Sequence, residues 1–368
     1  MDVLELTQRL IEFDTVTPKG SDCLDYIQVY VESLGFETTR LPFGEVDNLF
    51  ARRGTAEPHI MFAGHVDVVP PGEGWTHSPF TGVVENDILW GRGAVDMKGA
   101  IGAFLAAIPY SQPKGSISLL LTSDEEGPAK EGVVKVLPWL VENNHVPTFA
   151  LVGEPTSSER LADTIKNGRR GSISFDIETY GTQGHVAYPH LANNAASPLL
   201  ALLGILTSTT LDEGTPDFDP SNLEVVKLNM PNNAYNVIPG VAYASVNIRY
   251  NTLHSFESLT NFIHDAARKV KEEFGETFVI IQILSADPFL SSSANWGNIV
   301  AKAVESETGL KPLMSTSGGT SDARFIQKIC PVVELGLLNK TAHKVDEQVS
   351  LSDLKTLQKI YERIFLDQ

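Results

Sequence analysis

Cysteine is scarce in this sequence, and its scarcity bears on the redox compartment. Cys23 and Cys330 are the two cysteines among 368 residues. Both lie in segments with an apolar pattern, where a buried free thiol is the simplest expectation. Such usage disfavours the disulfide framework of a small secreted protein. We therefore expect a cytoplasmic protein whose two cysteines are unpaired.

Long apolar runs are also missing. The longest strongly apolar stretch, LLALLGIL at 199–206, is far shorter than the roughly 20 residues that a membrane-spanning helix needs. The opening segment, MDVLELTQRLIEF, has neither the basic start nor the apolar core of a signal peptide. We expect neither a membrane span nor a secretory leader.

Basic residues are outnumbered by acidic ones. The chain has 28 Lys and Arg against 46 Asp and Glu, and its formal net charge is −18. Nucleic acids and anionic membranes repel such a surface. The aromatic residues are not interleaved with basic ones, as they would be in a stacking platform for nucleic acid. We expect a small-molecule partner, with no nucleic acid and no membrane.

The first half of the chain alternates helical and strand patterns. Helices are predicted at 2–13, at 22–34 and within DMKGAIGAFLAAI, and strands at 60–64, 116–122 and 149–153. This alternation predicts an α/β fold with a mostly parallel, doubly wound sheet.

The pattern changes near residue 171. In GSISFDIETYG, the alternation of Ile173, Phe175 and Ile177 predicts a half-exposed strand. Further elements are expected in the order helix, strand, strand, helix, strand, at 196–208, 223–230, 242–250, 258–274 and 277–284. The resulting order, βαββαβ, is that of a ferredoxin-like α+β unit.

The first pattern resumes after this unit. NWGNIVAKAVESE predicts a helix, and CPVVELG predicts a buried strand. We therefore predict a discontinuous catalytic domain formed by 1–170 and 286–368. The ferredoxin-like domain is expected as an insertion at 171–285.

Acids and histidines stand where the predicted strands end. Ligands of open parallel sheets bind beyond the carboxyl ends of the strands. Alone, each of these residues has an ordinary explanation, such as a helix cap or a core histidine, but their joint placement predicts one site. The residues are His65, Asp67, Asp96, Glu125, Glu126, Glu154 and His343.

The ligand types favour zinc. Imidazole combined with carboxylate suits Zn²⁺, whereas Mg²⁺ and Ca²⁺ prefer oxygen ligands. Suppose that Asp96 bridges two ions. His65 and Glu154 then hold one ion, and Glu126 and His343 hold the other. Three carboxylates and a bridging hydroxide would balance the charge of two Zn²⁺.

The triplet Asp124, Glu125 and Glu126 needs an explanation, because adjacent carboxylates repel one another. A solvated acidic turn before a helix is the plain alternative. Neighbouring side chains cannot easily point at one ion, so we expect Glu126 to be a ligand and Glu125 a general base, with Asp124 in support. We expect Asp67 to accept the second N–H of the His65 imidazole and fix its tautomer.

The motifs GHVDVVP, GRGAVDMKG, SDEEG and GEPT, followed by a late histidine, occur in that order along nearly the whole chain. In this series the chain resembles the dinuclear zinc aminoacylase and carboxypeptidase family. The resemblance implies two Zn²⁺ per subunit, with Co²⁺ as a substitute, and Glu125 as general acid/base. It also implies a homodimer whose inserted domain covers the active site, and a cis peptide bond between Asp96 and Met97.

His185, in GTQGHVAYPH, is a further candidate for catalysis. It lies too far along the chain to count as a metal ligand by spacing. A histidine N–H would help to stabilise the oxyanion that amide hydrolysis generates. The resemblance implies that this histidine reaches the active site of the partner subunit. The alternative is a loop histidine on a dimer surface with no part in catalysis.

Substrate contacts are predicted from charge and from motifs shared with the family. The resemblance implies a strongly anionic substrate, such as a succinylated diamino-diacid, and an acidic protein needs a local positive pocket to bind it. The turn STSGGTSDARF opens a helix whose free N–H groups could hold a carboxylate, or it is a helix start capped by Thr320 or Ser321. The candidates are Arg169, Tyr188, Asn236, Arg249, Gly319 and Thr320.

Three functions are compatible with these residues. The leading hypothesis is metal-assisted hydrolysis of the amide bond of an N-succinylated amino acid. A sister amidase of the same family, such as an acetylornithine deacetylase or a dipeptidase, would share all the metal ligands. A catalytically dead binding module is the remote alternative, and the presence of Glu125 beside all five ligands argues against it.

Overall fold

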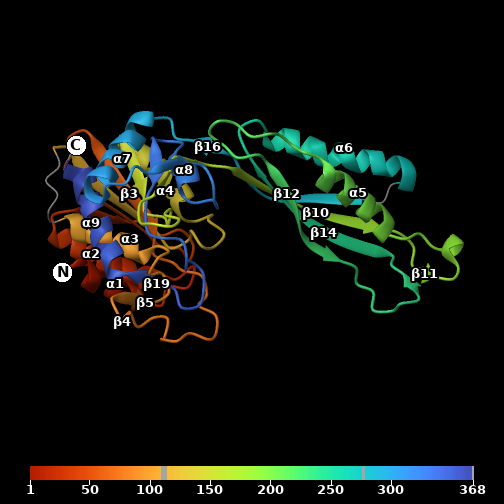
Figure 1. Ribbon diagram of the computed structural model, residues 1–368, viewed down its shortest axis with the longest axis horizontal. Coiled ribbons are helices and arrows are strands. Elements are labelled where there is room, and N and C mark those ends of the chain that lie inside the picture. The colour runs from red at the N-terminus through yellow and green to blue at the C-terminus, as the bar shows by residue number, and fades with distance from the viewer. Residues whose placement is uncertain (109–113, 276–277, 367–368) are drawn as a thin grey trace. The chain divides into compact units, whose positions relative to one another are not determined.

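The computed structural model describes residues 1–108, 114–275 and 278–366, and the chain divides into two compact units (Figure 1). The first unit comprises Met1–Gly168, Leu290–Ser315 and Ser321–Gln368, and the second comprises Arg169–Phe289 and Thr316–Thr320. From the sequence, the second domain was expected at 171–285, without the turn at 316–320. Thr277, where it began the last strand of that domain, lies outside the described residues.

Among the described residues, the first unit contains a mixed sheet of eight strands. Its central neighbours β6, β3, β7 and β18 are parallel to one another, and antiparallel pairing occurs toward both ends. In sheet order the strands are β1(Glu37–Arg40), β2(Asn48–Arg53), β6(Ser116–Thr122), β3(His59–His65), β7(Phe149–Val152), β18(Val332–Glu334), β8(Thr164–Lys166) and β17(Leu313–Ser315).

The two longest central strands are buried throughout. Every residue of HIMFAGH in β3 and of SISLLLT in β6 is buried. Strands covered on both faces have near-continuous apolar sequences rather than alternating ones. These two runs therefore form the centre of the sheet, and polar side chains follow where each run ends.

Helices pack around this sheet. α3 contacts α1 and α9, α4 contacts α8, and α7 contacts α9. Small residues let α3 approach its neighbours closely: a Cβ added at Gly102 would lie 2.2 Å from Oγ1 of Thr7 in α1. The helices of this unit are α1(Val3–Ile11), α2(Ser21–Ser33), α3(Lys98–Ala107), α4(Val133–Glu142), α7(Ala294–Thr308), α8(Ala323–Ile326) and α9(Leu351–Leu366).

A small antiparallel sheet in the same unit joins distant parts of the chain. It is formed by β4(Val83–Glu85), β5(Ile88–Trp90) and β19(Gln348–Ser350), in the order β19-β5-β4. The register places Trp90 opposite Gln348. The residues that follow β5 therefore lie beside the residues that precede β19.

The second unit has the expected ferredoxin-like order. Its antiparallel sheet, β12-β14-β10-β15, and its two helices follow the chain as βαββαβ. Ile173, Phe175 and Ile177 are buried on one face of β10, as the alternation predicted. The elements are β10(Gly171–Tyr180), α5(Ala196–Ser208), β12(Asn222–Asn229), β14(Val241–Tyr250), α6(Phe256–Phe274) and β15(Phe278–Ala286).

Short elements complete the two units. The chain passes from one unit to the other within β9(Gly168–Arg169) and β16(Phe289–Leu290), and again at both ends of the turn at 316–320. The second unit also contains β11(Gly184–His185), η2(Pro189–Leu191) and β13(Val237–Ile238).

Other expectations meet mixed outcomes. Cys23 and Cys330 are buried and unpaired, as expected. At the start of α8 the Ser321 hydroxyl accepts from the backbone N–H of Ala323 at 3.3 Å, as expected of a capping side chain, and it also donates to Glu334; Asp322, directly before the helix, makes no side-chain cap bond. Within the part of the chain that the structure describes, no helix combines the length and apolarity needed to cross a bilayer.

Candidate metal centre

The predicted ligands all belong to the first unit and lie at or just beyond the ends of its strands. His65 is the last residue of β3, and Asp96 lies between β5 and α3. Glu126 follows β6, and Glu154 follows β7. Because β6, β3 and β7 are parallel neighbours, their carboxyl ends meet at one edge of the sheet.

One group of side chains surrounds the imidazole of His65. Its Nε2 lies 3.3 Å from Oδ1 of Asp96 and 3.6 Å from Oε1 of Glu154. One ligand atom from each of the three residues lies within 4.8 Å of the others, close enough to share a metal ion. We call His65, Asp96 and Glu154 the first ligand set.

A second group shares Asp96. The Nε2 of His343 lies 3.1 Å from the other oxygen of Asp96, Oδ2, and 2.7 Å from Oε1 of Glu126. These three residues also present ligand atoms within 4.8 Å of one another. We call Asp96, Glu126 and His343 the second ligand set. Asp96 thus offers one oxygen to each set.

Hydrogen bonding also indicates that the first ligand set could bind a cation, independently of its residue types. Three of its buried atoms, Nε2 of His65, Oδ1 of Asp96 and Oε1 of Glu154, have no hydrogen-bond partner among the described residues. Buried polar atoms without partners are rare in folded proteins. One nitrogen and two carboxylate oxygens that lack partners and converge are what a metal ion would bind.

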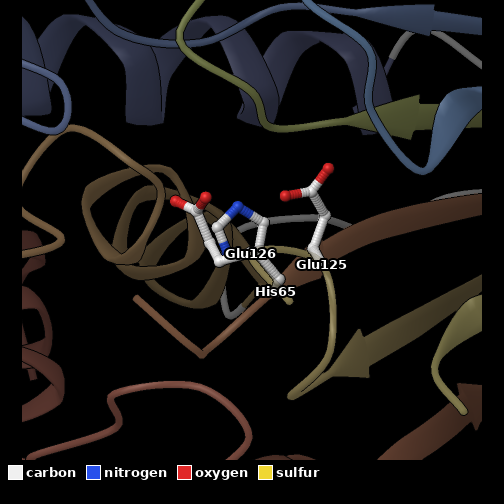
Figure 2. A group of neighbouring side chains, drawn as sticks. All are labelled: His65, Glu125 and Glu126. Atoms are coloured by element: carbon white, nitrogen blue, oxygen red, sulfur yellow. The ribbon is translucent and has the colours of Figure 1, made fainter. Parts of the chain in front are cut away.

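Glu125 also lies beside His65. Figure 2 shows the imidazole with the carboxyl groups of Glu125 and Glu126 on either side of it. One ligand atom from each of these three residues lies within 4.8 Å of the others. The geometry therefore puts Glu125 within reach of the same region as the ligands.

The other acids next to the centre fix the backbone that carries it. Oxygens of Asp124 accept hydrogen bonds from the backbone N–H groups of Ala129, Lys130 and Glu131, at 3.1, 2.8 and 2.9 Å. The carboxylate of Asp124 therefore orders the loop after β6 and does not point to the ligand sets.

Asp67 faces the second ring nitrogen of His65, as expected. The Nδ1 of His65 lies 2.9 Å from the backbone carbonyl oxygen of Asp67 and 3.7 Å from its carboxylate. The carbonyl is therefore the group of Asp67 that orients the imidazole. The carboxylate accepts instead from the backbone N–H groups of Glu125 and Glu126, at 3.3 and 3.1 Å.

The electrostatics of the centre reflect acids and histidines that are buried close together. Burial lowers the pKa of His65, but Asp96 and Glu154 outweigh burial and raise it well above its usual value. Burial raises the pKa of Glu154, and the negative charges of Asp96 and Glu125 raise it further. Burial opposes the ionisation of Asp96, yet His343 and His65 hold its pKa below the usual range.

Neighbouring charges, hydrogen bonds and burial also shift the pKa values of His343 and Glu125. Hydrogen bonds to Asp96 and Glu126 raise the pKa of His343 to about 10. Burial raises the pKa of Glu125 to about 8, and the negative charge of Asp322 adds to that rise. A bound cation would lower the pKa values of these carboxyl groups and imidazoles, because it favours ionised carboxylates and neutral imidazoles.

The peptide bond between Asp96 and Met97 is cis, as the family resemblance implied. The neighbouring Met97 side chain accepts a hydrogen bond at its Sδ from the backbone N–H of His65, at 3.4 Å. Met97 therefore links two residues of the first ligand set, because it follows Asp96 in the chain and its side chain contacts the backbone of His65.

The predicted substrate contacts and His185 lie in the second unit, so they are described apart from the ligand sets. The guanidinium of the buried Arg169 donates to the carbonyl of Ser317, at 3.3 Å. His185 and Tyr188 are exposed, and Nδ1 of His185 accepts from the backbone N–H of Ala187 at 3.0 Å. The other candidates are Arg249 on β14, the exposed Asn236, and Gly319 and Thr320 in the turn at 316–320.

Three buried charged residues near the centre were not predicted from the sequence. Arg92 and Glu347 form a buried ion pair, with 2.7 Å between Nη1 and Oε2. Neither carboxylate oxygen of the buried Asp322 has a hydrogen-bond partner among the described residues. Arg92 lies in the quoted motif GRGAVDMKG and Asp322 in STSGGTSDARF, and Glu347 follows His343 by four residues, but composition alone gave no reason to separate them from surface charge.

The sequence model of the peptidase family M20/M25/M40 matches residues 61–367. The chain belongs to this family, and the family expected from its motifs is confirmed.

Two relatives extend this result. The chain is 47% identical to the succinyl-diaminopimelate desuccinylase of Rhizorhabdus wittichii, over 99% of this chain and 97% of that protein. It is also 47% identical to the enzyme of the same name from Maricaulis maris, over 98% of this chain and 94% of that protein.

Solved structures share the fold. An M20 family metallo-carboxypeptidase from Sulfolobus solfataricus superposes with a TM-score of 0.81 at 17% identity, covering 99% of both chains. A protein from Bacillus subtilis described as a dinuclear metal-binding peptidase of the M20 family gives a TM-score of 0.75 at 14% identity, covering 99% of this chain and 97% of that one. At these identities the likeness concerns the fold alone, and it confirms the predicted fold class.

Proposed function

We propose that this protein is a metal-dependent amidohydrolase that cleaves N-succinyl-LL-2,6-diaminopimelate to succinate and LL-2,6-diaminopimelate, in the biosynthesis of diaminopimelate and lysine. The observation that carries the proposal is the pair of ligand sets that share Asp96. They occur in a chain 47% identical over nearly its full length to proteins named for this reaction.

The centre holds two Zn²⁺ ions in this proposal. The first ligand set, His65, Asp96 and Glu154, holds one ion, and the second set holds the other through Asp96, Glu126 and His343. Each set combines one imidazole with carboxylates, which suits zinc. The description of the Bacillus subtilis structure as dinuclear supports a count of two.

Bound zinc supplies Lewis-acid chemistry, which polarises a carbonyl and lowers the pKa of water. Glu125 supplies the proton transfers. Its carboxylate takes a proton from the attacking water, and the same group then gives that proton to the departing amine. Its placement beside His65 supports this part (Figure 2).

The backbone around Glu125 is held in place by its neighbours. The Asp67 carboxylate binds the N–H groups of Glu125 and Glu126, and Asp124 binds the following loop. These bonds keep the general base and its neighbouring ligand at fixed positions. Positioning of this kind is what proton transfer over a hydrogen-bond distance requires.

The second unit recognises the anionic substrate in this proposal. Arg169 and Arg249 supply positive charge, and the turn with Gly319 and Thr320 supplies N–H groups for a carboxylate. Tyr188 and Asn236 supply further polar contacts.

The protein acts as a homodimer in the cytoplasm. The second unit dimerises and covers the active site, and His185 donates a hydrogen bond to the developing oxyanion in the partner's site. The exposure of His185 on β11 supports a contact beyond its own unit. A symmetric dimer would then contain two composite sites.

Turnover on a small panel of substrates tests the proposed function. The protein is first treated with a chelator, then given zinc, and then offered N-succinyl-diaminopimelate, N-acetylornithine and a dipeptide. We expect succinate release to exceed acetate or amino-acid release by orders of magnitude, and to require the added metal. Preferred release of acetate would indicate a deacetylase. Activity that is unchanged by chelation would show that hydrolysis does not require a metal.

A further inference from the structure

Arg92 and Glu347 are both deeply buried, with side chains 2% and 0% exposed. Their ion pair is short, with 2.7 Å between Nη1 of Arg92 and Oε2 of Glu347. A buried ion pair is costly to desolvate, and its contribution to stability alone is often small. The contacts of the pair suggest a more specific use.

The Glu347 carboxylate binds the whole turn that leads to Asp96. Besides Arg92, its Oε2 accepts from the N–H of Gly93 at 3.0 Å. Its Oε1 accepts from the N–H groups of Val95 and Asp96, at 2.8 and 3.0 Å. One carboxylate thus fixes the backbone of the residue that both ligand sets share.

Arg92 binds two other loops of the centre. Its Nη1 also donates to the carbonyl of Lys344, the residue after His343, at 3.1 Å. Its Nη2 donates to the carbonyls of Pro71 and Pro70, at 3.2 and 3.4 Å, in the loop that follows β3. The planar fork of a guanidinium can make such divergent bonds at once, which a lysine ammonium cannot reproduce.

The loop that bears His343 depends on outside support. His343 and Asp346 have φ values of 61° and 60°, in the left-handed region that residues other than glycine rarely adopt. The Asp346 carboxylate accepts from the backbone N–H and the hydroxyl of Thr76, both at 2.8 Å. Glu347 then anchors the end of this loop, at the start of β19.

We propose that Arg92 and Glu347 are a positioning pair that holds the Asp96 loop and the His343 loop together, so that the second ligand set is assembled before metal binds. The inference rests on the proposed function, since it concerns the metal that this function needs. The first ligand set depends less on the pair, because His65 and Glu154 are placed by the buried strands β3 and β7.

Calorimetric titration of the chelated protein with Zn²⁺ tests the pair through metal affinity rather than activity. Glu347→Gln keeps the shape of the side chain. It replaces one acceptor oxygen with an NH₂ group, which then faces N–H donors that it cannot bind. We expect zinc affinity at the second set to fall by about 10- to 100-fold, the usual effect of losing a partner that orients a ligand, and affinity at the first set to stay within about threefold. Glu126→Gln, which removes a ligand of the second set, identifies which binding step belongs to that set.

Asp212→Asn is the matched control. The Asp212 carboxylate also accepts several N–H bonds, from Gly214, Ser221 and Asn251, and it lies in the second unit, whereas every proposed ligand belongs to the first. We expect both zinc-binding steps to be unchanged in this variant. A loss of affinity at the second set in Asp212→Asn would show that general loosening explains the effect and would overturn the inference.

Arg92→Lys is the second variant, and it decides the matter if Glu347→Gln does not fold. Lysine keeps the positive charge but lacks the planar guanidinium and its divergent N–H donors. We therefore expect the same loss of zinc affinity at the second set, with the first set unaffected. Unchanged affinity at the second set in a folded variant, or an equal loss at both sets, would overturn the inference while leaving the proposed function intact. A wild-type protein that binds no zinc would remove the proposed function itself, and the inference with it.

Discussion

Nε2 of His343 lies 2.7 Å from Oε1 of Glu126, although 217 positions separate the two residues in the chain. His343 is half exposed and Glu126 is nearly buried, with side chains 51% and 8% exposed. The contact joins the loop after β6 to the loop before β19. Both residues also present ligand atoms within 4.8 Å of an oxygen of Asp96, and the three residues together form the second ligand set.

The first prediction concerns that contact. Glu126→Gln removes an anionic ligand from the second set, so we expect the variant to lose about one of two zinc equivalents on dialysis. Metal analysis by mass spectrometry of the dialysed protein measures the loss. Glu131→Gln is the control, because Glu131 contacts the Asp124 loop through its backbone. Full zinc retention by Glu126→Gln would exclude Glu126 as a ligand.

The second prediction separates the base from the ligands. Glu125→Gln should retain zinc but lose turnover by about 10²- to 10⁴-fold, the usual contribution of general acid/base catalysis. Steady-state kinetics together with metal analysis measures both quantities on one sample. Glu142→Gln, at an exposed acid near the end of α4, should leave both unchanged. Near-normal turnover in Glu125→Gln would take the proposed part away from this residue.

The third prediction concerns catalysis across a dimer. His185→Ala and Glu125→Gln should each be inactive alone, but a mixed dimer of the two contains one intact composite site. We expect about half of the normal activity per mixed dimer. A mixture of Glu125→Gln with Glu126→Gln is the control, because every composite site in it lacks one of these residues. If activity does not recover after subunit exchange is verified, His185 does not act in trans.

The fourth prediction concerns stability away from the centre. His59 is buried in β3, where Nε2 lies 2.7 Å from the Ser118 hydroxyl and Nδ1 lies 3.3 Å from the carbonyl of Val146. Both contacts suit a neutral imidazole. Burial, followed by the positive charge of Arg52, lowers the pKa of His59 from 6.5 to about 4.

The sign of the pH dependence follows from this shift. The unfolded chain takes up a proton at His59 near pH 6.5, whereas the folded protein does so only near pH 4, so stability falls as the pH falls through that window. Between pH 7 and pH 5 the free energy of unfolding should fall by about 2 kcal/mol through this residue. Urea unfolding of the wild type, of His59→Gln and of the exposed-site control His264→Gln measures it. An equal pH dependence in the wild type and His59→Gln would contradict the prediction.

Much of the centre could be predicted because parallel strands bring their carboxyl ends together. Residues such as His65 and Glu154 directly follow buried apolar runs, so the sequence itself indicates the edge of the sheet at which they lie. The ferredoxin-like order of the second unit was predicted for a similar reason, since the alternation at Ile173, Phe175 and Ile177 is a local pattern.

The rest depends on contacts that no local pattern encodes. The Arg92–Glu347 pair exists because β5 and β19 pair across the chain, and 255 positions separate the two residues. The orientation of His65 depends on whether a carbonyl or a carboxylate of Asp67 faces its Nδ1, and the two lie close together. Composition gives the residue types at such places but not their partners.

Diffraction from crystals grown with zinc, recorded on both sides of the zinc absorption edge, tests the two-metal centre most directly. The account predicts two anomalous peaks that share Asp96, each about 2.0–2.2 Å from its ligand atoms. One peak should lie against His65 and Glu154, and the other against Glu126 and His343. A single peak, or peaks that do not contact Asp96, would contradict the account.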